Sequence, residues 1–263
     1  MSAAPSEAPA TVELGGGFIY VRRPDGRAAI LAPHLQSAGV AGMMSPSSVN
    51  ARDASELRTW LEHWGFETSL PIAQVNQVHG VAVVKARPDD ASPDESDGLW
   101  FDGDGLILSI KAADCAPVWL ADMASKRFAL VHAGWRGVAD GIIASAVDAL
   151  AAGGSEAQEL AVAVGPHLRP CCFEVGPEVA ERFAAIEGAI KSADQLRVQR
   201  RRDDSVSLDL AAAILADLSD LGVRGEQVFV ATACTHCHPD LFHSYRRNGS
   251  GGPLMAAIAA RRT

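Results

Sequence analysis

Five short apolar segments follow one another between residues 71 and 132, and this grouping constrains the fold more than any other feature. Each is five or six residues long, which suits a strand and is too short for a helix. They are PIAQV (71–75), VAVVK (81–85), GLILSI (105–110), PVWLA (117–121) and RFALVH (127–132). LAVAV (160–164) and VFVAT (228–232) follow later. Strands that come in a group before most of the helices indicate an α+β fold rather than strict alternation.

Four other segments space their apolar residues as an amphipathic helix does, and two charged segments lack any such pattern. The helical segments are 53–64, 138–150, 177–190 and 214–222. Asp53 suits an N-cap, Pro177 a first helical turn and Gly222 a C-terminal cap. Of the charged segments, DESDGLWFDGDG (94–105) lacks the ligand spacing of an EF-hand and indicates turns, and RVQRRRDDSV (197–206) indicates a solvated loop or strand edge.

Composition narrows the class of protein. A chain of 263 residues can bury a large core, and its net charge of −9 argues against a nucleic-acid or anionic-membrane partner. The first residues resemble no secretory signal, no apolar run is long enough to span a bilayer, and we predict a disordered tail over residues 1–12. Five cysteines, an odd number, indicate free thiols in a reducing compartment. We therefore expect a cytoplasmic protein.

Three reactive side chains stand at or just beyond the ends of predicted strands, beside small residues. His79 precedes Gly80, Cys115 follows GLILSI, and His132 ends RFALVH. Each also has an ordinary structural explanation, because a histidine at a strand end is usually only hydrogen-bonded and a lone cysteine usually packs as a small hydrophobe. Their separations match no local zinc-finger pattern. These residues alone leave a metal site open without favouring it.

A second group of metal-binding residue types lies in ATACTHCHPDLF (231–242). Cys234, His236, Cys237 and His238 fall within five positions, and they spell the C-x-x-C-H pattern of haem attachment. Haem attachment requires export to an oxidising compartment, for which the chain shows no signal. The segment alone therefore does not decide which group binds a metal.

Five motifs in a fixed order identify a family. They are NQVHG, AADCAPVWLAD, VHAGWRG, GPHLRPCCFEVGPEV and CTHCHPDLFHSYRRNGSGG, between about residues 70 and 258. Together they closely resemble the YfiH family, also called the laccase-domain or multicopper polyphenol oxidoreductase family, which includes bacterial purine nucleoside phosphorylases and the peptidoglycan editing factor. The resemblance implies an α/β/β/α sandwich with mixed sheets, as a single catalytic domain over residues 13–263.

The resemblance also implies a metal site. It places a zinc ion on His79, Cys115 and His132, and Cys115 and His132 are the expected catalytic residues. Imidazole and thiolate suit zinc, and three protein ligands leave a fourth position for water or substrate. The same ligands suit copper, which stays an alternative. A cysteine hydrolase without metal, with Cys115 as nucleophile and His132 as base, and a zinc-stabilised binding module without turnover are others.

The resemblance changes the interpretation of the second group. Cys234 and Thr235 match the family motif, whereas His236, Cys237 and His238 fall in its variable part. We therefore predict that this group holds neither haem nor the active metal, with a second zinc site on Cys234 and Cys237 as the alternative. Cys171 and Cys172 match a family motif too, and we interpret them as packing residues. Gly252 and Pro253 stand where the family usually has Gly-Arg.

The function implied is zinc-dependent phosphorolysis of adenosine and inosine, with methylthioadenosine phosphorolysis and adenosine deamination as further activities. A peptidoglycan-precursor editing hydrolase and a copper-dependent polyphenol oxidase are the alternatives. We predict that Arg136 or Arg246 binds phosphate, because the planar guanidinium pairs with two phosphate oxygens at once. An ion pair between Arg136 and Asp140 is the competing explanation. The expected partners are a purine nucleoside and phosphate, and we expect a monomer.

Overall fold

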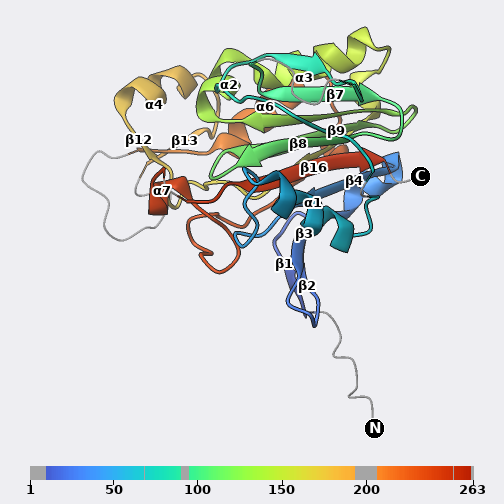
Figure 1. Ribbon diagram of the computed structural model, residues 1–263. Helices are drawn as coiled ribbons and strands as arrows, with labels where there is room; N and C mark the ends of the chain where they lie inside the picture. Colours follow the sequence, from blue (N-terminus) through green and yellow to red (C-terminus); the bar gives the residue numbers. More distant parts are fainter. Residues whose placement is uncertain (1–9, 68, 90–94, 193–205, 251, 262–263) are drawn as a thin grey trace.

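Two β-sheets lie face to face at the centre of the protein, with helices on both outer sides (Figure 1). The computed structural model describes residues 10–67, 69–89, 95–192, 206–250 and 252–261. This arrangement is the α/β/β/α sandwich with mixed sheets, in one domain, that the family resemblance implies. The sheets bring together segments that lie far apart in the sequence.

The first sheet has seven strands, and its centre includes a strand from late in the chain. In order they are β1 (Ala10–Glu13), β2 (Ile19–Arg22), β3 (Ala28–Ala32), β4 (Val40–Met44), β16 (Met255–Arg261), β8 (Ile107–Ala112) and β5 (Ile72–Gln74). Only the edge pair β5–β8 is parallel among these neighbours. A 3₁₀ helix, η1 (Pro33–Ala38), joins β3 to β4.

The second sheet has six strands built around the hairpin of β9 and β10. In order they are β15 (Val228–Val230), β11 (Leu160–Val164), β9 (Ala116–Asp122), β10 (Arg127–Ala133), β7 (Gly98–Asp102) and β6 (Val83–Lys85). Both edge pairs, β11–β15 and β6–β7, are parallel. Parallel neighbours end at the same edge of a sheet, so the segments that follow them meet there.

The helices and a small third sheet complete the described chain. The helices are α1 (Ala54–His63), α2 (Trp135–Asp140), α3 (Ile142–Ala152), α4 (Pro177–Phe183), α6 (Leu210–Asp220) and α7 (Tyr245–Asn248), with 3₁₀ turns η2 (Ala157–Glu159) and η3 (Gly225–Gln227). The third sheet has the order β12 (Glu174–Val175), β14 (Val206–Leu208), β13 (Ile190–Ser192). None of the described helices has both the length and the apolar composition that crossing a bilayer requires.

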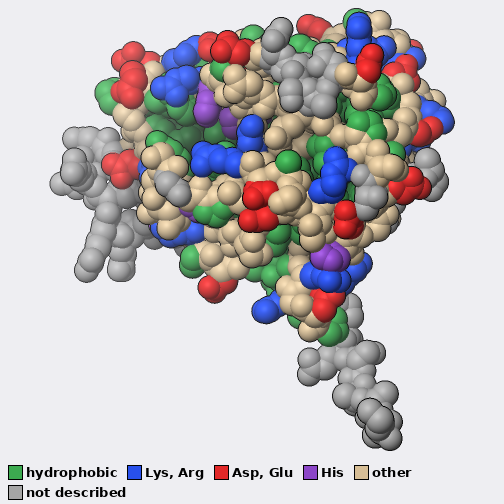
Figure 2. Space-filling view, in the orientation of Figure 1, with side chains coloured by type: hydrophobic (Ala, Val, Ile, Leu, Met, Phe, Trp, Pro, Cys, Tyr) green, Lys and Arg blue, Asp and Glu red, His purple; other side chains and the backbone are tan. Residues whose placement is uncertain are grey.

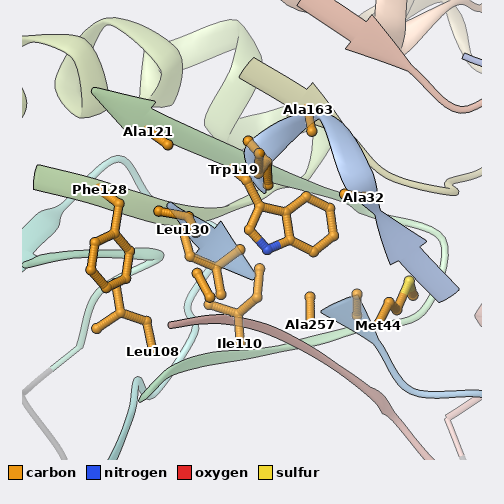
Figure 3. Packing of buried hydrophobic residues seen from close by; sticks show 14 of the residues in the cluster. Ala32, Met44, Leu108, Ile110, Trp119, Ala121, Phe128, Leu130, Ala163 and Ala257 are labelled. Carbon is orange, nitrogen blue, oxygen red and sulfur yellow. The ribbon is translucent and has the colours of Figure 1, made fainter. Parts of the chain in front are cut away.

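Strand alternation explains how the layers hold together, because successive side chains of a strand point to opposite faces. Trp119, Phe128 and Leu130 enter the core between the two sheets, where they meet Leu108 and Ile110 from β8 (Figure 3). The intervening residues of β9 and β10 pack instead against α3 and α6. On the other side, α1 covers the seven-stranded sheet. The Trp119 indole N–H donates to the Ile258 carbonyl at 2.8 Å and so links the sheets.

Local signals explain several helix boundaries. The Asp53 carboxylate accepts hydrogen bonds from the backbone N–H groups of Ser55 and Glu56, which confirms the predicted N-cap of α1. Pro177 starts α4, as expected. Gly141, at φ 97°, separates α2 from α3 in the segment expected to form one helix.

Some expectations need correction. Ile190, expected on the α4 stripe, pairs in β13, and the segment expected to form turns at 94–105 contains the strand β7. Residues 10–12, assigned to the tail, lie in β1, whereas residues 1–9 fall outside the described residues. Most of the segment 197–206, expected to form a solvated loop or strand edge, also lies outside the described residues.

One acidic side chain on α6 makes stability depend on pH. Burial, followed by repulsion from Asp220, raises the pKa of Asp217 from 3.8 to about 6. The folded state therefore disfavours the charged carboxylate, and this cost is absent below pH 3.8 and complete above about pH 6. We expect Asp217→Asn to raise the free energy of unfolding at pH 8 by about 1 kcal/mol, a value reduced for the partial exposure of the side chain.

Urea unfolding of both proteins at pH 8 and pH 4 measures this effect. The gain from Asp217→Asn should disappear at pH 4, where the carboxyl is largely protonated in the folded protein. Asp220→Asn, at an exposed position on the same helix, is the matched control and should give a smaller gain. Equal gains at both pH values would contradict the burial argument.

Candidate metal centre

The three predicted ligands come together where the chain passes from one sheet to the other. Cys115 lies in the short connection between β8 and β9, His132 is near the end of β10, and His79 follows β5. One ligand atom from each lies within 4.8 Å of the other two. The imidazole rings of His79 and His132 are 4.9 Å apart and nearly perpendicular. The described residues thus form a group of two histidines and one cysteine that suits a metal ion.

A buried carboxylate that sequence reasoning missed orients both histidines. Asp97 is fully buried just before β7, and its Oδ1 accepts from His132 Nδ1 at 2.8 Å and from the His79 N–H at 3.0 Å. Its Oδ2 accepts from the N–H groups of Val78 at 3.1 Å and Gly80 at 2.7 Å. Since Asp97 occupies Nδ1, the nitrogen of His132 that remains for a metal is Nε2.

The same contacts hold the His79 loop in an uncommon backbone conformation. His79 has a φ of 62°, in the left-handed region, and three consecutive N–H groups converge on the Asp97 carboxylate. Burial alone would raise the pKa of Asp97, but the hydrogen bonds from His132 and Gly80 hold it below its usual value. Asp97 is therefore charged at neutral pH and fixes the positions of two ligands.

In the metal-free centre Cys115 already has the protonation state that binds a metal, whereas His132 must first release a proton. Burial would raise the pKa of Cys115, but the neighbouring His132 and His79 lower it to about 6. Burial would lower the pKa of His132, but the Cys115 and Asp97 charges raise it to about 9. Cys115 is thus a thiolate at neutral pH, the form that binds metals. The absence of a side chain at Gly134 leaves room for Cys115 and His79 to lie close together. A Cβ at this position would lie 3.2 Å from the Cys115 sulfur and 3.1 Å from the His79 ring.

Asp114, beside Cys115, ties a late segment of the chain to the centre. It has a φ of 80°, and its carboxylate accepts from the Thr235 hydroxyl at 2.5 Å, the Ser244 hydroxyl at 3.0 Å and the Arg246 N–H at 2.7 Å. Sequence reasoning assigned no role to Asp114. Its position between a strand and Cys115 was the available signal.

A cavity of about 630 Å³ opens beside the three ligands. Figure 2 shows histidine side chains in a hollow bordered by apolar and basic side chains. Its wall includes the apolar or aromatic side chains Trp135, Leu168, Phe173, Tyr245 and Leu254 and the basic side chains Arg52, Lys111, Arg136 and Arg246. Among the described lining residues, Asp114 is the one acid, and its carboxylate is already hydrogen-bonded. The cavity is therefore basic within an acidic protein and suits an anionic ligand.

The two arginines predicted to bind phosphate both line this cavity, but they differ in their contacts. The exposed Arg136 guanidinium lies 4.4 Å from the centre of the Trp135 ring. Asp140, the acid suggested as an ion-pair partner of Arg136, pairs with Arg182 among the described residues. The Arg246 guanidinium donates to the Glu174 carbonyl at 3.1 Å. Arg136 is thus the more available of the two.

The second group of metal-binding residue types forms a cluster of its own. Cys234 and Cys237 lie with Cys171 and Cys172, and one sulfur from each lies within 4.8 Å of the others. Cys171 is exposed, which corrects its interpretation as a packing residue. His238 stands outside the cluster, with its ring edge-on to Phe242. The C-x-x-C-H pattern therefore does not act as a unit.

Comparisons with known proteins agree with this geometry. The family model described as "Multi-copper polyphenol oxidoreductase laccase" matches residues 47–261. "Purine nucleoside phosphorylase PA4543" of Pseudomonas aeruginosa is 35% identical over 184 residues, which are 70% of this chain and 72% of that protein. "Adenosine deaminase RL5" of an unknown prokaryotic organism is 32% identical over 145 residues, 55% of this chain and 54% of that protein.

The fold has a close structural counterpart. The crystal structure of the Bacillus licheniformis hypothetical protein YfiH superposes with a TM-score of 0.79. The superposition covers 91% of this chain and 98% of that chain, at 20% sequence identity. At this identity the likeness concerns the fold alone.

Proposed function

Because the chain belongs to the multi-copper polyphenol oxidoreductase laccase family, we propose that it is a zinc-dependent purine nucleoside phosphorylase acting on adenosine and inosine. The observation that carries the proposal is the His79, Cys115 and His132 group opening into a basic cavity with aromatic walls. Aromatic and apolar walls suit a purine base, and guanidinium groups suit phosphate. The relatives' names as purine nucleoside phosphorylases support the substrate class.

In this reaction phosphate attacks C1′ of the ribose, the C1′–N9 bond breaks, and the purine leaves with its bonding electrons and takes up a proton. His79, Cys115 and His132 would hold the zinc ion, and Asp97 would keep the His132 ring in position. Zinc bound there would supply a Lewis acid that polarises a substrate oxygen or lowers the pKa of water. Arg136 would bind the phosphate. Helix α2 has only six residues, so phosphate binding would depend on the guanidinium and not on the helix start.

Two further activities follow from the same centre. Adenosine deamination is supported by the relative named as an adenosine deaminase. Methylthioadenosine phosphorolysis would use the same purine and phosphate sites. A multicopper mechanism is less well supported, because neither potential metal group among the described residues contains more than two histidines. The monomeric state, the cytoplasmic location and the absence of a nucleic-acid partner stay predictions.

A nucleoside panel with and without phosphate, analysed by chromatography, tests the proposal. Adenosine and inosine should give free base and ribose 1-phosphate only when phosphate is present. Conversion of adenosine to inosine without phosphate would identify deamination. If protein replete with zinc forms no product from any nucleoside, the proposed function is wrong.

The geometry also supports a metal-free cysteine hydrolase as the second candidate. A Cys115 thiolate beside a protonated His132, held at 2.8 Å by Asp97, resembles the nucleophile, base and carboxylate of cysteine hydrolases. Removal of metal separates the two candidates. A chelator should abolish phosphorolysis, whereas a cysteine hydrolase would keep or gain activity and would lose it on alkylation of the metal-free protein.

The phosphate site gives a separate prediction. Arg136→Met keeps much of the side-chain length and removes the charge, so the half-saturating phosphate concentration should rise roughly 10-fold to 100-fold, the value of a charged hydrogen bond. Zinc content should not change. Arg246→Met should raise the half-saturating phosphate concentration less, because the Arg246 guanidinium already donates hydrogen bonds to the Glu174 carbonyl.

Steady-state kinetics at varied phosphate concentration measure this effect. Arg182→Met, which removes an exposed arginine paired with Asp140, is the matched control and should leave the phosphate dependence unchanged. If neither Arg136→Met nor Arg246→Met shifts the half-saturating concentration, phosphate binds elsewhere.

A further inference from the structure

Four cysteines from two distant parts of the chain meet beside the substrate cavity. Cys171 and Cys172 lie between β11 and β12, and Cys234 and Cys237 lie in the segment after β15. The Cys237 sulfur is 3.7 Å from the Cys171 sulfur and 3.4 Å from the Cys172 sulfur. All four sulfurs lie within 4.8 Å of one another, and all are free thiols. We call this group the four-cysteine cluster.

The spacing of the sulfurs matches a tetrahedral metal site. With zinc–sulfur bonds of about 2.3 Å, the edges of a tetrahedron of sulfurs measure about 3.8 Å. The two sulfur–sulfur distances at Cys237 are close to this value. Four cysteines are also a common ligand set of structural zinc sites, and the C-x-x-C spacing of Cys234 and Cys237 is typical of one half of such a site.

The backbone around Cys234 is arranged for a charged sulfur. The Arg169 N–H donates to the Cys234 sulfur at 3.5 Å, and the chain turns tightly as the Cys237 N–H bonds to the Cys234 carbonyl at 3.2 Å. Turns that direct N–H groups at a thiolate stabilise its charge.

Four thiolates cannot share so small a space without a cation to offset their repulsion. A divalent metal would supply that charge and release the protons.

We propose that Cys171, Cys172, Cys234 and Cys237 bind a second zinc ion in a closed structural site, separate from the centre of His79, Cys115 and His132. Four protein ligands complete the tetrahedral coordination and leave no position for substrate, so this ion has no catalytic role.

The position of the cluster indicates a structural role for the ion in the cavity wall. The segment that carries Cys171 and Cys172 also carries Leu168 and Phe173, which line the substrate cavity. Arg246, which also lines the cavity, donates to the Cys172 carbonyl at 3.3 Å. An ion bound to all four sulfurs would join the segments after β11 and β15 and so keep this part of the wall in place.

Metal analysis of the full-length protein, purified under reducing conditions without added metal, tests the proposal. The parent should contain two zinc ions per chain, Cys237→Ser one, Cys115→Ala one, and the double variant none. Cobalt substitution distinguishes the sites, because four thiolates give a much stronger sulfur-to-cobalt charge-transfer absorption than one. This absorption should persist in Cys115→Ala and be largely lost in Cys237→Ser.

The control is His238→Ala, which removes the histidine next to Cys237 in sequence and should keep both ions. Native mass spectrometry of the parent gives the stoichiometry even if Cys237→Ser folds poorly, and Cys171→Ser at an exposed position provides a second variant. One zinc in the parent that Cys237→Ser retains would overturn the proposal, as would a disulfide within the cluster of freshly isolated protein. Neither result would bear on nucleoside phosphorolysis, which the product analysis tests separately.

Discussion

Replacing Cys115 with alanine should lower both the metal affinity of the centre of His79, Cys115 and His132 and the rate of nucleoside phosphorolysis, each by roughly a hundredfold or more. Cys115 is the only ligand of the three that carries a negative charge, and two imidazoles alone hold a divalent ion weakly. The fold should survive, because Cys115 lies half-buried in a connection between strands and not in a packed core.

Metal content, activity and circular dichroism, measured on the same preparations, check this prediction. Cys115→Ser is the matched control for size: its hydroxyl does not ionise at neutral pH, so it should lose metal and activity as the alanine variant does. The assignment would be wrong if Cys115→Ala kept full metal occupancy at the centre.

Asp97→Asn should weaken metal binding by 10-fold to 100-fold, the usual effect of removing a carboxylate that orients a histidine ligand. Asp97 accepts four hydrogen bonds through its two oxygens. An asparagine offers one oxygen, and its NH₂ group would face N–H donors that it cannot satisfy. The variant should therefore also lose about 3 kcal/mol of unfolding free energy, because buried donors are left without acceptors.

Chelator competition and urea unfolding of the metal-depleted protein measure the two effects separately. The matched control is Asp102→Asn at the other end of β7, where the carboxylate makes a partly exposed ion pair with Arg127 at 3.3 Å. Asp102→Asn should leave both the metal affinity and the unfolding free energy nearly unchanged. Unchanged metal affinity in Asp97→Asn would show that His132 keeps its orientation without the carboxylate.

Local patterns were sufficient for the strands β5, β6, β8, β9 and β10 and for helix α1. Buried strands with apolar runs and a helix with an Asp53 cap carry their signals within a few residues. The strand β7 was missed because its flanks are rich in Asp and Gly, which resemble turns. The role of Asp97 depends on the pairing of β7 with both β6 and β10, and no local pattern specifies these pairings.

The resemblance to a family selected the three ligands, and topology explains why they meet. Topology also explains the four-cysteine cluster. Because β11 and β15 are parallel neighbours, the segments that follow them leave the sheet at the same edge, and a bridge between His167 and Cys234 continues the pairing. About sixty residues separate the two cysteine pairs in sequence. Considered alone, Cys171 and Cys172 were therefore interpreted as packing residues, and Cys234 and Cys237 as part of a coincidental motif.

The position of β16 sets a condition on biosynthesis. This strand lies between β4 and β8, which precede it by more than a hundred residues, and its Ile258 carbonyl accepts the Trp119 indole hydrogen bond. While the ribosome is still adding residues before Met255, the strands β4 and β8 each have an unpaired edge, and such edges favour aggregation. The seven-stranded sheet can close only after Met255–Arg261 has left the exit tunnel. Nascent chains stalled before β16 should therefore depend on chaperones that shield exposed strands, and chains released after it should not.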